Sequence, residues 1–142
     1  MVDSNTPYIY SMKRVSFDFD GTLDIDVVAT YAKELVERGV EVWVTTSRMD
    51  NTQGSPNEND DLFDLTSKCK ISLTNVHFTN GGWKAAYMEK IDCDFTWHLD
   101  NDWLEITRIM ALNIPMKGIT NVGNPDWKVQ CEELLNFDEV DI

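Results

Sequence analysis

The stretch that decides the fold is VSFDFDGTL, residues Val15–Leu23. A short, β-rich apolar run leads into two aspartates, Asp18 and Asp20, which are followed by a glycine and a threonine. Apolar residues then recur at helical spacing, which predicts a helix over Ile25–Arg38. A strand that passes through an acidic turn into a helix is typical of the first unit of an alternating α/β chain.

The same alternation continues along the chain. We expect strands over Val15–Phe19, Val40–Thr46, Asn75–Thr79, Phe95–Leu99 and Lys117–Val122. Helices are expected over Ile25–Arg38, Asp61–Lys70, Trp83–Lys90, Asp102–Leu112 and Pro125–Asn136. This order predicts an α/β fold: a three-layer, Rossmann-like parallel sheet of about five strands with helices on both faces.

Local signals refine this prediction. Asp24 or Asp26 is expected to cap the first helix, and Gly39 suits the position just past its end. The polar stretch Arg48–Asp61 is interpreted as a long surface loop, and loops of this kind are often functional. The length of 142 residues predicts a single domain over 1–142.

The charge balance restricts the partners. There are 25 acidic and 12 basic residues, which gives a formal net charge of −13. Such a chain repels phosphate backbones and anionic membrane surfaces, so nucleic acid and membranes are disfavoured as partners. The same acidity invites a bound cation.

Cysteine usage indicates a reducing compartment. Cys69, Cys93 and Cys131 are an odd number with no CxxC spacing, so neither a disulfide framework nor a zinc cluster is expected. Residues Met1–Tyr10 carry no basic region before an apolar run, and no stretch approaches 18 apolar residues. We therefore expect a cytoplasmic protein without a signal peptide or a membrane span.

Ligands of open parallel sheets bind beyond the carboxyl ends of the strands. The residues at those ends are carboxylates, hydroxyls, one amide and one lysine: Asp18, Asp20, Thr22, Thr46 with Thr45 and Ser47 as competing hydroxyls, Lys84, Asp100, Asn101 and Asp102. Neighbouring carboxylates raise each other's pKa, and a hard cation such as Mg²⁺ removes that conflict because it prefers oxygen ligands. A cation beside a carboxylate also prepares a site for a phosphoryl group.

In these residues and their order the chain resembles the haloacid dehalogenase superfamily, in its phosphatase branch. The resemblance covers about Lys13–Val122. The first motif of that family, DxDGT, corresponds to Asp18–Thr22, and its second, a Thr or Ser ending the next strand, to Thr46. Its third, a lysine near a helix start, corresponds to Lys84, and its fourth, an acidic pair, to Asp100-Asn101.

The resemblance implies roles for these residues. Asp18 would be the nucleophile that forms an aspartyl-phosphate, and Asp20 would protonate the leaving group and then activate water. Thr46 and Lys84 would bind phosphoryl oxygens. The implied Mg²⁺ ligands are Asp18, the backbone carbonyl of Asp20, Asp100 and, in place of a second acid, Asn101 or Asp102.

Four other residues near these motifs have two interpretations each. Arg48 either clamps the substrate phosphate or is an exposed loop residue. Trp83 and Trp103 are expected in the core, with stacking on a base or sugar as the alternative. His98 is expected to pack in the sheet with satisfied nitrogens, with a catalytic role as the alternative.

The spacing of the motifs leaves no room for a large cap domain, because Asp20 and Thr46 lie close together in sequence. The resemblance then implies an open site for a small phosphorylated metabolite such as a nucleotide, with an oligomer as one way to cover it. A polynucleotide-end phosphatase is the alternative substrate class. The alternatives to an enzyme are a phospho-receiver or metal-binding regulatory module, and a degenerate family member that acts as an interaction protein.

Overall fold

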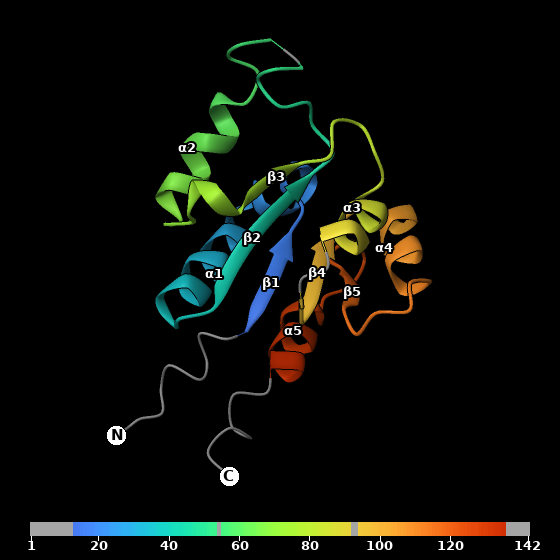
Figure 1. Ribbon diagram of the computed structural model, residues 1–142. Coiled ribbons are helices and arrows are strands. Elements are labelled where there is room, and N and C mark those ends of the chain that lie inside the picture. Colours follow the sequence, from blue (N-terminus) through green and yellow to red (C-terminus); the bar gives the residue numbers. More distant parts are fainter. Residues whose placement is uncertain (1–12, 54, 92–93, 136–142) are drawn as a thin grey trace, which may run out of the picture.

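The computed structural model describes residues 13–53, 55–91 and 94–135. In this part of the chain, five parallel strands form one sheet in the order β3-β2-β1-β4-β5 (Figure 1). The strands are β1 (Arg14–Phe17), β2 (Glu41–Thr46), β3 (Val76–Phe78), β4 (Trp97–Asp100) and β5 (Lys117–Thr120). The helices are α1 (Asp26–Glu37), α2 (Asp60–Lys68), α3 (Lys84–Ile91), α4 (Trp103–Met110) and α5 (Trp127–Leu135). The predicted α/β architecture is confirmed.

The helices cover both faces of the sheet, as the alternating side chains of the strands require. Val42 and Val44 of β2 point into a core shared with α1, α2 and α5, whereas Trp43 between them packs against α3 and α4. Trp97 is fully buried on the α1 side, where its Nε1 donates to the backbone oxygen of Cys131 on α5. These contacts form the three layers seen in Figure 1.

The first strand is shorter than expected and ends at Phe17 rather than Phe19. Residues Phe19–Leu23 form a wide helical turn whose backbone departs from helical geometry at Asp20 and Gly21. Gly21 has a φ of +80°, a conformation that glycine adopts without strain. A Cβ built there would also lie 2.3 Å from Asn101 Nδ2, so a side chain at this position would clash with Asn101.

The expected aspartate cap of α1 is wrong. Ile25 occupies the N-cap position and no side chain caps this helix end. Asp24 is engaged elsewhere, because its Oδ1 accepts a hydrogen bond from the backbone nitrogen of Gly21 at 2.9 Å. The other end agrees with the prediction: Gly39 follows the C-cap residue Arg38 with a φ of +88°.

The described residues contain no large insertion that would cap the sheet, and the segment between β2 and α2 is a loop, as expected. None of the helices in the described ranges has the length and apolarity needed to cross a bilayer. Cys69 and Cys131 are buried free thiols. Cys93 and Asn136, the expected last residue of the final helix, lie outside the described residues.

Candidate functional site

Three of the expected site residues meet at the carboxyl edge of the sheet. Asp18 follows β1, Asp100 ends β4, and Lys84 is the first residue of α3. Lys84 Nζ lies 2.5 Å from Asp18 Oδ1 and 2.7 Å from Asp100 Oδ2, and all three side chains are almost completely buried. The structure therefore joins residues far apart in sequence into one ion cluster (β1, β4 and α3 in Figure 1).

This cluster has one ammonium group for two carboxylates. Burial raises the pKa of Asp18 to about 7, although the charge of Lys84 lowers it. Burial also raises the pKa of Asp100, but hydrogen bonding to His98 and the charge of Lys84 outweigh this and bring it to about 2. The pKa of Lys84 is raised because the two carboxylates more than offset its burial. With both aspartates ionised, the cluster holds an excess negative charge in a buried place.

Behind Asp100, a chain of hydrogen bonds crosses three strands. His98 Nε2 lies 2.7 Å from Asp100 Oδ2, His98 Nδ1 lies 2.9 Å from Ser16 Oγ, and Ser16 Oγ lies 2.8 Å from Thr45 Oγ1. Burial lowers the pKa of His98, which favours the neutral imidazole with one N–H. With that N–H directed at the Asp100 carboxylate, the Ser16 hydroxyl donates to Nδ1. The expectation that His98 packs in the sheet with satisfied nitrogens is confirmed, and its contact orients Asp100.

A second set of oxygens lies on the other side of Asp18. One end of the Asn101 amide lies 2.8 Å from Asp18 Oδ2 and 3.0 Å from the backbone oxygen of Asp20. With nitrogen at this end, the amide donates a hydrogen bond to each oxygen. With oxygen at this end, three oxygens face one another.

These separations fit a magnesium site. An Mg–O distance of about 2.1 Å in octahedral geometry places adjacent ligands about 3 Å apart. Asp18 Oδ2, Asp20 O and Asn101 Oδ1 provide oxygens of the kind that Mg²⁺ prefers. Only one of these three ligands is a carboxylate, because the others are an amide and a main-chain carbonyl. A group of three His, Cys, Asp or Glu side chains suited to a metal is absent from the described residues.

The other predicted metal ligands, Asp100 and Asp102, make hydrogen bonds within the protein. Asp100 directs Oδ2 at Lys84 and His98, and its Oδ1 accepts from the backbone nitrogen of Asp102 at 3.0 Å. Asp102 caps α4, because its Oδ1 accepts from the backbone nitrogen of Leu104 at 2.9 Å. The structure therefore places Asn101, rather than Asp102, beside Asp18.

Of the candidate hydroxyl groups at the end of β2, that of Thr46 is buried at the carboxyl edge. Its Oγ1 accepts a hydrogen bond from the backbone nitrogen of Arg48 at 3.2 Å. The neighbouring Thr45 side chain instead contacts Ser16 in the chain behind His98. Thr46 thus retains its position as the candidate for contact with a phosphoryl oxygen.

Arg48 contacts two carboxylates. Its Nε and one terminal nitrogen donate to Asp20 at 2.9 and 2.7 Å, and its two terminal nitrogens donate to Asp61 at 2.7 and 2.9 Å. Its Cζ lies 4.8 Å from the centre of the Phe19 ring. A contact to Asn59 Oδ1 at 3.4 Å completes a set in which all five N–H groups of the guanidinium have acceptors.

Sequence reasoning missed three residues of this edge. Asp61 is the second residue of α2, and no pattern in the sequence would pair it with Arg48. Asn121 follows β5; it accepts from Thr22 Oγ1 and donates to the backbone oxygen of Gly21, both at 3.1 Å. Glu105 Oε1 accepts from the backbone nitrogen of Lys84 at 3.0 Å, so a carboxylate of α4 already occupies the N-terminus of α3.

The expectation that Trp83 and Trp103 belong to the core is wrong. The Trp83 side chain is 41% exposed and lies under the Arg108 guanidinium, with 3.7 Å from Cζ to the ring centre. Trp103 is 61% exposed at the start of α4. Both residues follow turns at the carboxyl edge, where the ends of the helices do not cover them.

Comparison of the chain with known proteins identified no relative. No family model, no curated protein and no solved structure matches the chain. The interpretation of the site therefore depends on the residues and distances given above.

Proposed function

We propose that the chain is a Mg²⁺-dependent phosphomonoester hydrolase of the haloacid dehalogenase type. The observation that carries this proposal is the buried cluster in which Lys84 contacts Asp18 and Asp100, beside the backbone oxygen of Asp20 and the side-chain amide of Asn101. A nucleophilic carboxylate, a lysine and a set of oxygen ligands are what phosphoryl transfer needs, since it depends mainly on positioning and charge stabilisation.

In the proposed reaction, a carboxylate oxygen of Asp18 forms a bond to the phosphorus while the ester P–O bond breaks. The leaving oxygen takes a proton from the carboxyl group of Asp20. A water molecule then attacks the phosphorus, Asp20 takes its proton, and the bond to Asp18 breaks to release inorganic phosphate. Thr46 and Lys84 hold the phosphoryl oxygens.

A divalent cation fits the chemistry of this site. Asp18 Oδ2, Asp20 O and Asn101 Oδ1 would hold Mg²⁺, which when bound would offset negative charge on the phosphoryl group. The excess negative charge of the Asp18, Asp100 and Lys84 cluster supports this, because the nucleophile must be ionised in a buried place. Lys84 alone cannot neutralise both carboxylates.

The test is phosphate release from nucleotides, sugar phosphates and 3′-phosphorylated oligonucleotides, with and without Mg²⁺, with Asp18→Asn as control. We expect release that needs Mg²⁺ and is absent in the control. An aspartyl-phosphate that persists for minutes after acetyl phosphate treatment, without turnover, would indicate a phospho-receiver module instead. Neither release nor Mg²⁺ binding, measured by calorimetry, would contradict the proposal.

Arg48 is assigned to the positioning of Asp20, because all its N–H groups already have protein acceptors. We expect Arg48→Gln and Asp61→Asn each to lower kcat about tenfold, because a displaced catalytic group loses effective concentration. KM and the inhibition constant of inorganic phosphate are expected to stay within about twofold, since neither residue touches the phosphate.

Steady-state kinetics with one small phosphomonoester check this assignment. Asp64→Asn, an exposed carboxylate on the same helix as Asp61, is the matched control and should match the unmodified protein. If Arg48→Gln weakens phosphate inhibition while Asp61→Asn has no effect, Arg48 contacts the phosphate and the assignment to Asp20 is incorrect.

A further inference from the structure

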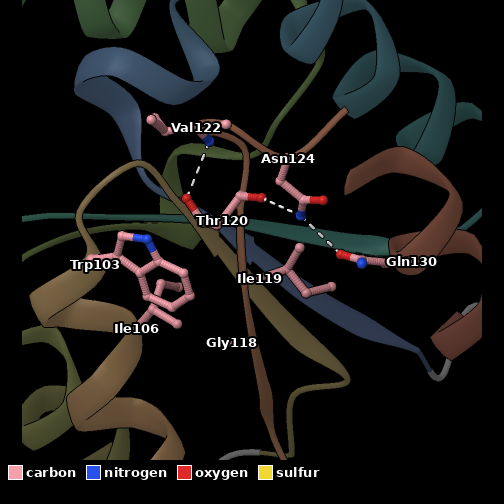
Figure 2. A pocket seen from close by; sticks show the side chains of 9 residues that line it. Trp103, Ile106, Gly118, Ile119, Thr120, Val122, Asn124 and Gln130 are labelled. Atoms are coloured by element: carbon pink, nitrogen blue, oxygen red, sulfur yellow. Dashed lines mark hydrogen bonds between the residues drawn. The ribbon is translucent and has the colours of Figure 1, made fainter. Parts of the chain in front are cut away.

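A pocket lies along the outer edge of the sheet, beside the site. It has a volume of about 630 Å³ and is bounded by β5, the start of α4, the loop after β5, and α5 (Figure 2). Its lining includes Trp103, Ile106, Thr120, Val122, Asn124 and Gln130. The volume lies within the range of pockets that hold small molecules.

Two chain segments connect this pocket to the candidate active site. Thr120, which lines the pocket, pairs in register with Asp100, and Trp103 follows Asp100 by three residues. Asn121, between the lining residues Thr120 and Val122, contacts Thr22 and Gly21 of the acidic turn. In the sheet, β4 separates β1 from β5, so the pocket begins about two strand spacings, roughly 10 Å, from Asp18.

The walls of the pocket suit a flat, neutral ring. The indole of Trp103 and the side chain of Ile106 lie on one side, and Asn124 and Gln130 lie across from them (Figure 2). Asn124 Nδ2 donates to the Thr120 backbone oxygen at 2.8 Å and to Gln130 Oε1 at 2.9 Å. These bonds fix the two amides and leave Asn124 Oδ1 as an acceptor and Gln130 Nε2 as a donor for a ligand.

The charge of the lining residues distinguishes further between classes of ligand. Among the described residues that line the pocket there is no Asp, Glu, Lys or Arg, so a second phosphate or a sugar acid would find no counterion. An aromatic wall opposite a donor and an acceptor suits a heterocycle with polar edges better than a plain phenyl ring. The net charge of −13 favours a single nucleotide over a polynucleotide.

We propose that this pocket binds the base of a nucleoside monophosphate whose phosphate lies at Asp18, with the sugar passing over the end of β4. As a statement about the substrate, this rests on the proposed phosphatase activity. Binding of a nucleoside in the pocket does not depend on phosphatase activity, and the second experiment below measures it separately. Trp103 is then a specificity-determining residue.

The first experiment compares KM for adenosine and uridine monophosphates with KM for ribose 5-phosphate and phenyl phosphate. We expect Trp103→Ala to raise KM for both nucleotides about tenfold, from the loss of base stacking, with no change for ribose 5-phosphate. Trp103→Phe should retain most of the affinity. Leu104→Ala, which removes an equally exposed apolar side chain beside Trp103 but outside the lining, should have no effect.

The second experiment measures binding of free adenosine and uridine by calorimetry and by NMR shifts of the tryptophan indole signals. It needs no turnover, so it distinguishes an incorrect pocket assignment from an incorrect catalytic assignment. Saturable binding that Trp103→Ala and Gln130→Leu both weaken would support the pocket even if no phosphate is released. Absence of nucleoside binding, or equal KM effects of Trp103→Ala on nucleotides and ribose 5-phosphate, would overturn it. Tighter binding of phenyl phosphate than of the nucleotides would also overturn it.

Discussion

Asp18→Asn is expected to have two opposite effects: loss of turnover and a more stable protein in the absence of metal. Loss of the proposed nucleophile should lower kcat by at least about a thousandfold. The stability gain follows from the buried carboxylate, whose pKa burial raises to about 7 from an ordinary value of 3.8. Asparagine keeps an oxygen for Lys84 but carries no charge that burial would penalise.

The direction in which the free energy of unfolding changes with pH follows from proton binding to Asp18. Between about pH 4 and pH 7 the folded protein holds the Asp18 proton and the unfolded chain has lost it, so the free energy of unfolding falls as pH rises. Above this range the metal-free protein should be less stable than Asp18→Asn by about 4 kcal/mol, because each pKa unit between the unfolded and the folded value is worth about 1.4 kcal/mol. Asp100, whose pKa is lowered to about 2, adds stability as pH rises to about 4 and none beyond that.

Urea unfolding of both proteins in the presence of a chelator, at pH 5 and pH 8, measures this effect. We expect Asp18→Asn to be the more stable protein at both pH values, with a difference that is about 3 kcal/mol larger at pH 8 than at pH 5. A difference that is the same at both pH values would show that Asp18 is not the group responsible. Mg²⁺-dependent turnover that survives in Asp18→Asn would refute the assignment of the nucleophile.

Much of the fold could be predicted because local patterns determine it. Apolar runs of strand length alternate with helical periodicity, and an all-parallel sheet follows from that alternation. The placement of Asp18, Thr46 and Asp100 at one edge follows from the parallel direction of the strands. The register between strands, in contrast, depends on how the side chains of all layers pack, and it is the register that places His98 beside Ser16.

The parts that sequence reasoning missed are contacts between segments without a common pattern. Arg48 and Asp61 come together because the intervening loop returns to the sheet edge, and no local preference determines that path. Asp24 fails to cap α1 because the sharp turn at Gly21 offers it a nearer backbone nitrogen. The pocket beside β5 exists because α4 and α5 lie on opposite faces of an edge strand, which is a property of the assembled layers.

The second large effect is expected for Lys84→Met. Methionine fills a similar volume but removes the ammonium group that lies between two buried carboxylates. Removing one partner of a buried ion pair costs about 3–5 kcal/mol, because the remaining charge has no compensation. Phosphate release should also be lost, since Lys84 holds the phosphoryl oxygens in the proposed reaction.

A double-mutant cycle separates this electrostatic effect from a packing defect. If the uncompensated charge of Asp18 causes the loss, adding Asp18→Asn to Lys84→Met should restore about half of the lost stability or more at pH 8. A packing defect would persist in the double variant. Lys90→Met, an exposed lysine on the same helix, is the matched control and should change the free energy of unfolding by less than about 0.5 kcal/mol. Equal stability of the two methionine variants would mean that Lys84 does not neutralise the cluster, and the case for a phosphoryl site at this edge would then fail with it.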